Sequence, residues 1–142
     1  MTEELRRAKE ALDADATITL AVCRDGELTM SREKGIRPLL KFTQGGDELK
    51  NTCAADRIVG KAAAMLYVLT GVKEVFAEVL SKQGQTILER YGIAHEYSTL
   101  TENIINRSGT GLCPMEEAVK DIDDLKEALA AIQAKVAALA KG

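Results

Sequence analysis

A change of hydrophobic period near the N-terminus constrains the fold more than any other feature of this sequence. The run from Thr17 to Cys23 is apolar and rich in β-forming residues, and the run from Glu27 to Ser31 alternates, with Leu28 and Met30 on one side. Asp25-Gly26 stands between the two runs, and an Asp-Gly pair flanked by strands is typical of a tight β-hairpin. The fold therefore contains an antiparallel strand pair.

Helical and extended patterns alternate around this hairpin. An amphipathic helix is predicted before it, over Thr2–Asp13, with Leu5, Ala8 and Leu12 on one face. The predicted elements that follow are a short helix opened by Pro38, an Ala-rich helix over Thr52–Leu69 closed by Gly71, a strand over Val72–Leu80, a helix over Ser81–Tyr91, a strand over Ile93–Tyr97, and a helical region from Pro114 through Ala140.

Strand-helix-strand alternation after a hairpin predicts a three-layer α/β/α domain with a mixed sheet. A chain of 142 residues has the length of one domain with one core. We expect residues 1–142 to form a single domain, with a core over about residues 17–119 and a C-terminal helix over about residues 120–140.

Composition excludes several functional classes. The net charge of −3 argues against a nucleic-acid binder, which needs clustered Lys and Arg to neutralise phosphates. The sequence has no apolar run of roughly 18 to 20 residues, so no membrane span is expected. The charged start of the chain, Met-Thr-Glu-Glu-Leu-Arg-Arg, does not resemble a signal peptide, and a cytoplasmic location is expected.

The cysteines and the single histidine are scattered. Cys23, Cys53 and Cys113 form no CxxC pair, and an odd number of cysteines in a chain without an export signal indicates reduced thiols. His95 is the one histidine. Because structural zinc sites use closely spaced Cys and His ligands, no metal and no other cofactor are expected.

Several polar residues stand next to glycine or proline, where the backbone can approach a ligand. Cys113 precedes Pro114 and is a predicted helix N-cap, a position that favours a thiolate, and Glu116 lies in the same turn. Lys61 follows Gly60, and its side chain is either solvated or contacts an anion. Before the segment Ser-Gly-Thr-Gly come Asn106 and Arg107, and the Arg107 guanidinium has the donors to clamp a phosphate or carboxylate.

Four segments together resemble a known family. They are Lys34–Leu40 (KGIRPLL), Ala55–Ala64 (ADRIVGKAAA), Ile105–Arg107 (INR) and Cys113–Glu116 (CPME). They are similar to the DUF1893 family, a prokaryotic family whose fold is similar to that of cytidine deaminases. The resemblance implies a pocket where two helix N-termini converge, here the turns at Cys53–Asp56 and Ser81–Gly84.

Zinc deaminase chemistry does not transfer with this resemblance. Zinc deaminases carry a His or Cys followed two residues later by a catalytic Glu, and a Pro-Cys-x-x-Cys on the next helix. Here Ala55 stands two residues after Cys53, and the helix predicted from Ser81 has no cysteine. The site expected from this sequence is therefore not a zinc site.

The leading hypothesis is a deaminase-like domain that binds a small anionic ligand, such as a nucleoside or nucleotide. In it Asp56 and Glu116 accept hydrogen bonds or act as acid and base, Lys61 and Arg107 meet the anion together with the amides near Ser81, and Asn106 and Cys113 complete the pocket. One alternative is a thiol enzyme with Cys113 as nucleophile, assisted by Asp56 or Glu116. Another is a non-catalytic interaction module that forms a homodimer through its terminal helices, since Ile122, Leu125, Leu129, Ile132, Val136 and Leu139 follow a 3-4 spacing.

Overall fold

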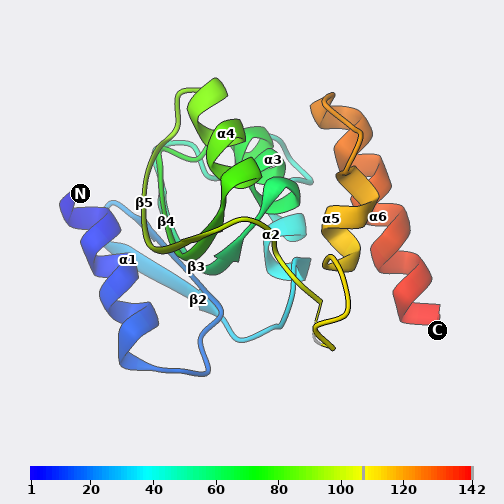
Figure 1. The fold of residues 1–142 in the computed structure, drawn as a ribbon. Coiled ribbons are helices and arrows are strands. Elements are labelled where there is room, and N and C mark those ends of the chain that lie inside the picture. The colour runs from blue at the N-terminus through cyan, green and yellow to red at the C-terminus, as the bar shows by residue number, and fades with distance from the viewer. Residues whose placement is uncertain (107, 142) are drawn as a thin grey trace.

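The computed structural model describes residues 1–106 and 108–141, and six helices and five strands lie within them (Figure 1). In chain order they are α1 (Glu3–Ala14), β1 (Leu20–Arg24), β2 (Glu27–Ser31), α2 (Arg37–Lys41), β3 (Cys53–Val59), α3 (Lys61–Thr70), β4 (Glu74–Ser81), α4 (Lys82–Arg90), β5 (Ala94–Thr101), α5 (Pro114–Val119) and α6 (Leu125–Lys141).

The sheet is mixed, with the strand order β2-β1-β3-β4-β5. β1 pairs antiparallel with both β2 and β3, while β3, β4 and β5 run parallel to one another. The predicted hairpin is confirmed: Asp25 and Gly26 join β1 to β2 with φ angles of 51° and 82°. Positive φ at both positions matches the twist of the flanking strands, and Asp-Gly tolerates it.

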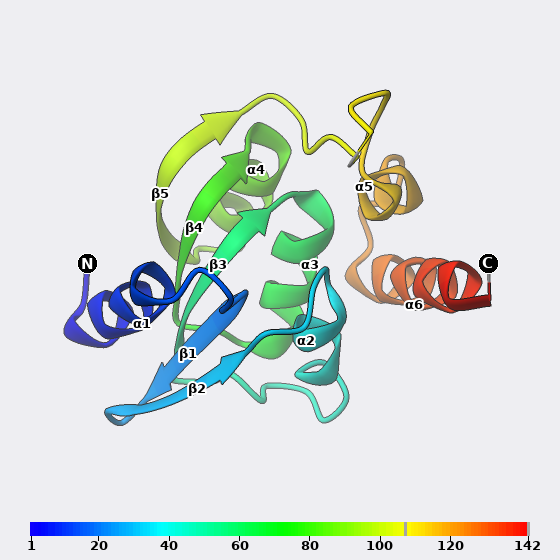
Figure 2. The same ribbon diagram turned by 90° about the horizontal axis from the view of Figure 1, so that it is seen from below.

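Helices cover both faces of the sheet (Figure 2). The face under α1 holds a core in which Leu5, Ala8 and Leu12 pack against strand residues that include Phe76. The opposite face, which carries α2, α3 and α4, holds a larger core centred on α3. The chain is therefore an α/β protein with a five-stranded mixed sheet, an N-terminal hairpin and C-terminal helices.

The predicted helix over Thr52–Leu69 is wrong in its first half. Residues Cys53–Val59 form β3, the central strand, and α3 begins only at Lys61. Alanines occupy this strand because both of its faces are buried: Ala54 packs towards α3, and Ala55 packs towards α1. A strand buried on both sides loses the alternation that distinguishes it from a helix. Gly60 is consequently the N-cap of α3 and not a mid-helix glycine.

The helical region predicted from Pro114 through Ala140 is two helices, with a break over residues 120–124. The apolar residues of α6 that follow the 3-4 spacing (Leu125, Leu129, Ile132, Val136 and Leu139) form the seam of this helix, which packs against α3 and α5. Ile132 is fully buried, but Leu139 at the end of the seam is 54% exposed. The terminal helices α1 and α6 lie on opposite sides of the sheet and do not pair within the chain (Figure 2). Dimerisation stays a prediction.

No helix in residues 1–106 and 108–141 is both long and apolar enough to span a bilayer.

Candidate functional site

The first turns of α3 and α4 meet at the carboxyl edge of the parallel strands. Ser81 caps α4, and its hydroxyl accepts a hydrogen bond of 2.9 Å from the Gly84 amide. A Cβ placed on Gly84 would lie 3.0 Å from the carbonyl carbon and oxygen of Gly60. The two helix N-termini thus converge, as the family resemblance implies, but the first of them is at Gly60–Ala62 and not at Cys53–Asp56.

The carboxylate of Glu116 occupies the N-terminal end of α3. Its two oxygens accept hydrogen bonds from the backbone amides of Lys61 (2.8 Å) and Ala62 (2.9 Å). These amides have no partner within their own helix and carry the positive end of its dipole. Gly60 makes the approach feasible, because a Cβ there would lie 2.2 Å from Glu116 Oε1. Glu116 is therefore a buried cap supplied to α3 by α5.

Lys61 reaches the same junction from the first turn of α3. Its ammonium group donates a hydrogen bond of 3.3 Å to the carbonyl oxygen of Lys120 and lies 3.8 Å from a carboxylate oxygen of Asp123. Two predicted site residues, Lys61 and Glu116, are therefore brought together. Their polar groups are engaged within the chain, where they hold the α5–α6 segment against α3.

Cys113 is the N-cap residue of α5, as its place before Pro114 predicts. Its backbone amide donates a hydrogen bond of 2.9 Å to the carbonyl of Ile104, and its thiol is half-buried. Cys53 lies on the opposite side of the sheet, under α1, where burial raises the pKa of its thiol. The two cysteines do not share a site, and the nucleophilic role of Cys113 stays a prediction.

Asn106 shapes its own loop. Its side-chain oxygen accepts hydrogen bonds from the Thr110 amide (3.0 Å) and the Ser108 hydroxyl (3.1 Å), and its side-chain amide donates to Thr110 Oγ1. Its backbone amide donates to the carbonyl of Gly111 at 2.9 Å. Arg107, the predicted anion clamp, lies outside the described residues.

Asp56 lies on β3, on the face that α3 covers. It accepts a hydrogen bond of 2.7 Å from the hydroxyl of Tyr67, which is fully buried. Burial raises the pKa of Asp56 to about 6, and the hydrogen bond from Tyr67 opposes that rise. Burial also raises the pKa of Tyr67 well above its usual value, and the Asp56 carboxylate adds to this. A carboxylate that titrates near neutral pH is a candidate functional group, and it is also a source of pH-dependent stability.

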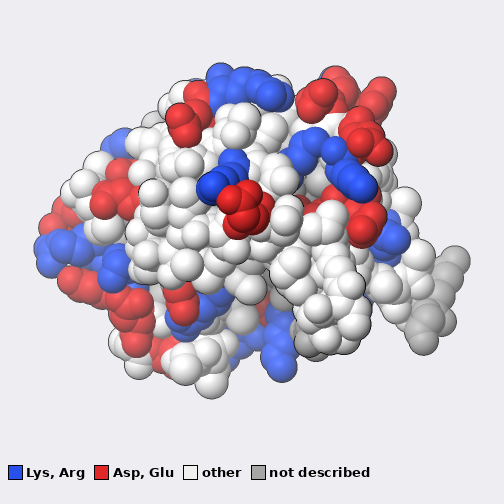
Figure 3. All heavy atoms as spheres, viewed as in Figure 1, with Lys and Arg blue, Asp and Glu red and all other residues white. Residues whose placement is uncertain are grey.

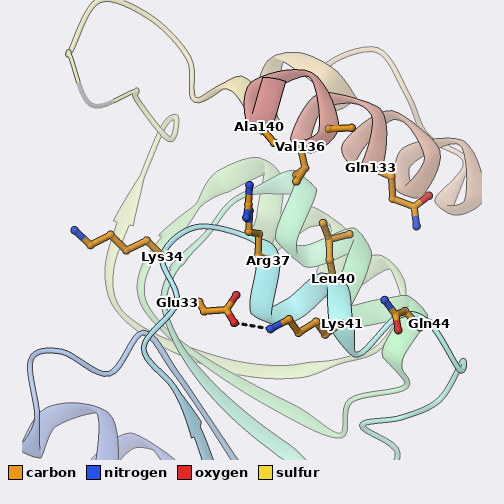
Figure 4. Close-up of a pocket in the computed structure, with 10 residues that line it drawn as sticks. Glu33, Lys34, Arg37, Leu40, Lys41, Gln44, Gln133, Val136 and Ala140 are labelled. Carbon is orange, nitrogen blue, oxygen red and sulfur yellow. Dashed lines mark hydrogen bonds and ion pairs between the residues drawn. The ribbon is translucent and has the colours of Figure 1, made fainter. Parts of the chain in front are cut away.

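A groove of about 900 Å³ runs between α2 and α6 (Figure 4). None of the described residues predicted for the site lines it. One wall comes from α2 and its flanks (Glu33, Lys34, Arg37, Leu40, Lys41, Gln44), and the other comes from α6 (Gln133, Val136, Ala137, Ala140).

The charge of this groove is opposite to that of the whole chain. Its first wall carries Lys34, Arg37 and Lys41 against the single carboxylate of Glu33, whereas the chain has a net charge of −3. Among the residues whose side chains the structure describes, the wall from α6 carries no ionisable side chain. Acidic side chains gather instead at the α5–α6 link, at the upper right of Figure 3, where Glu117, Asp121, Asp123 and Asp124 are exposed.

Sequence reasoning missed the groove, although one signal for it is present. Arg37 and Lys41 are four residues apart, and this spacing puts both cations on one face of a short helix. The second wall comes from α6, and nothing in the local sequence pairs that helix with α2. No cluster of three or more His, Cys, Asp or Glu side chains that could hold a metal ion occurs in the part of the chain that the structure describes.

Comparison of this chain with known proteins identifies the family to which it belongs. The family model described as "TM1506: Domain of unknown function (DUF1893)" matches residues 7–136. The crystal structure of a DUF1893 family protein (TM1506) from Thermotoga maritima is similar to this structure, with a TM-score of 0.84 and 23% sequence identity, over 95% of this chain and 92% of that chain. At this identity, the likeness concerns the fold alone. No curated protein matches the chain. The family match spans most of the sequence, as its short motifs predicted, and the chain therefore belongs to the DUF1893 family.

Proposed function

We propose that this protein binds a small anionic ligand in the groove between α2 and α6. The observation that carries the proposal is the pairing of a cationic wall with an apolar one in a single groove. Arg37 and Lys34 supply the positive charge, and Val136 and Ala137 supply the apolar surface. Ligand sites generally combine apolar lining with a few placed polar groups, and arginine suits phosphate and carboxylate.

The two cations are available to a ligand. Lys41 is already paired with Glu33 at 2.5 Å, but neither Lys34 nor Arg37 has an ion-pair partner among residues 1–106 and 108–141. Both side chains are exposed, and Arg37 points from α2 towards the wall formed by α6 (Figure 4). A bound anion would therefore displace water and not an internal partner.

The size of the groove also supports a small ligand. Its volume of about 900 Å³ is within the range of roughly 300 to 1,000 Å³ that small-molecule sites occupy. The proposed ligand is still a small anion, as the sequence predicts, but the proposed site differs from the pocket expected around Asp56, Lys61 and Glu116. At that pocket, Glu116 already occupies the free amides of α3.

We also infer that the fold is of the cytidine deaminase-like type. Support comes from the hairpin followed by two parallel strand-helix-strand units, and from the meeting of the α3 and α4 N-termini at Gly60 and Gly84. Fold type by itself is weak support for an activity. The proposed function therefore depends on the groove and not on this classification.

The test is a thermal-shift screen of the full chain against nucleosides, nucleotides, nucleotide sugars and divalent metals, followed by calorimetric titration of each positive ligand. A ligand at a hundredfold excess over its Kd stabilises the folded state by about 2.7 kcal/mol. Arg37→Gln should weaken binding roughly 10- to 100-fold, because a hydrogen bond to a charged group contributes about 1.5 to 3 kcal/mol. Arg90→Gln, an exposed change at the end of α4, is the matched control. The absence of a shift from every anionic ligand, or equal loss in both variants, contradicts the proposal.

A further inference from the structure

Two of the three cysteines lie directly opposite each other in the sheet. Cys23 on β1 and Cys53 on β3 are register partners in the antiparallel ladder, and both belong to the core under α1. Directly opposite residues of an antiparallel pair project from the same face, with Cα atoms about 4.5 or 5.5 Å apart. A disulfide joins Cα atoms that are about 4.4 to 6.8 Å apart. The ladder therefore holds the two thiols at a spacing that a disulfide can bridge.

Nothing in the local sequence pairs these two cysteines. Cys23 and Cys53 are thirty residues apart, and only the tertiary pairing of β1 with β3 brings them together. Both are free thiols in this structure, while the third cysteine, Cys113, lies at the start of α5. Where thiols are kept reduced, protein disulfides are usually transient and serve catalysis or redox sensing. A reduced pair held face to face is thus suited to reversible oxidation.

The helix α1 covers both cysteines. Each of the two is 0% exposed. The start of α1 is fastened beside Cys53: the Thr2 hydroxyl donates a hydrogen bond of 2.7 Å to the buried carboxylate of Glu74 on β4, and it lies 3.5 Å from Cys53 Sγ. The same hydroxyl caps α1 by accepting a hydrogen bond of 3.2 Å from the Leu5 amide. Thr2 therefore holds the cover closed at the site of the thiols.

The closed state protects the pair from oxidation. The thiolate is the form that attacks a disulfide, and burial raises the pKa of the Cys53 thiol. Opening of α1 would expose both thiols without breaking the sheet, because α1 supplies no strand to it. A terminal element that is fastened at few points opens locally with less free energy than the core. Access to the thiols is therefore set by α1.

We propose that Cys23 and Cys53 form a reversible disulfide between β1 and β3, and that α1 controls the access of the oxidant. The oxidant is a small disulfide such as glutathione disulfide. One cysteine thiolate attacks it, forms a mixed disulfide and releases one glutathione; the other cysteine then attacks the protein sulfur of that bond and releases the second. Two electrons pass to the oxidant, and the two thiol protons end on the two glutathione molecules. This site is separate from the α2–α6 groove and does not depend on it.

The experiment is oxidation of the folded full chain by glutathione disulfide at neutral pH, followed by peptide mass mapping. The expected product has lost two hydrogen atoms and links the peptides that contain Cys23 and Cys53. Cys113→Ser should form the same bond at the same rate, and dithiothreitol should reverse it. The oxidised chain should unfold at a higher urea concentration than the reduced chain, because the bond restricts the unfolded state by closing the loop over residues 24–52.

Thr2→Ala tests the role of α1 without altering a cysteine. It removes both the helix cap and the hydrogen bond to Glu74, so oxidation should be about two- to thirtyfold faster, the fold-change that corresponds to the loss of a cap. Thr86→Ala, an exposed change on α4, is the matched control and should leave the rate unchanged.

Each part of the proposal has an outcome that overturns it. A Cys23–Cys53 bond that forms only in urea, or oxidation confined to Cys113, shows that the folded ladder does not support the disulfide. An oxidised chain that unfolds at a lower urea concentration than the reduced chain shows the same. Equal rates in Thr2→Ala and Thr86→Ala show that α1 does not control access.

Discussion

Glu116 shows how one side chain can join two parts of the fold. Its carboxylate is the partner of the first two amides of α3, yet it comes from α5, far along the chain. A capping residue normally belongs to the helix that it caps, and the loss of a cap costs about 0.5 to 2 kcal/mol. Here the cap is also buried, so its loss leaves unpaired amides in a site with little access to water.

Glu116→Ala should lower the free energy of unfolding by about 2 to 4 kcal/mol, because two buried amides lose a charged acceptor. Urea unfolding of the purified variant measures this change. The control is Glu117→Ala, at the exposed neighbouring position on α5, which should change stability by less than about 0.5 kcal/mol. Equal effects of the two variants would show that Glu116 is not a structural cap.

Asp56 is predicted to make stability depend on pH. Its pKa is raised to about 6 in the folded state, above a value near 3.9 in the unfolded chain, so the folded state binds the proton more tightly. The stabilisation from this group is full below about pH 4 and is lost as pH rises through 6, which amounts to as much as about 3 kcal/mol. Asp56→Asn removes the titration and keeps an acceptor for Tyr67.

The measurement is urea unfolding of the wild type and Asp56→Asn at pH values from 4 to 7.5. The stability of the variant relative to the wild type should rise between about pH 4 and pH 6 and then level off above the folded-state pKa, because only the wild type must ionise this carboxylate in the folded state. A difference that is constant, or that falls as pH rises, contradicts the assigned pKa direction.

The helices and strands that the sequence predicts best are those determined by residues close together in the chain. The Asp25-Gly26 hairpin, the buried face of α1 and the Ser81 cap of α4 are all confirmed, because each depends on residues a few positions apart. The strand β3 was missed because it is buried between helices on both faces and is rich in alanine, the residue with the highest helix propensity. The groove was missed because its walls come from α2 and α6, and only the tertiary fold brings these together.

The seam of α6 is predicted to be structural over its first turns only. Ile132→Ala should destabilise the protein by about 2 to 4 kcal/mol, since Ile132 is fully buried against the α3 core. Leu139→Ala, at the same kind of seam position but 54% exposed, should change stability by less than about 0.5 kcal/mol. Thermal unfolding of both variants checks this. A large effect of Leu139→Ala in dilute protein would show that the end of α6 is covered in solution.

The whole molecule offers two places where a ligand could bind. One is the meeting point of α3 and α4, where the chain supplies its own carboxylate from Glu116. The other is the α2–α6 groove, where Lys34 and Arg37 face solvent. Sequence motifs pointed to the first, and the observed hydrogen bonds favour the second.

The most direct test is an amide NMR titration of the isotopically labelled chain with a nucleoside monophosphate and with inorganic phosphate. We expect ligand-dependent shifts to concentrate over residues 33–44 and 133–140, the two walls of the groove. Shifts concentrated instead at residues 60–62, 81–84 and 113–117 would place the ligand at the helix N-termini. That result would contradict ligand binding in the α2–α6 groove, as would the absence of any shift.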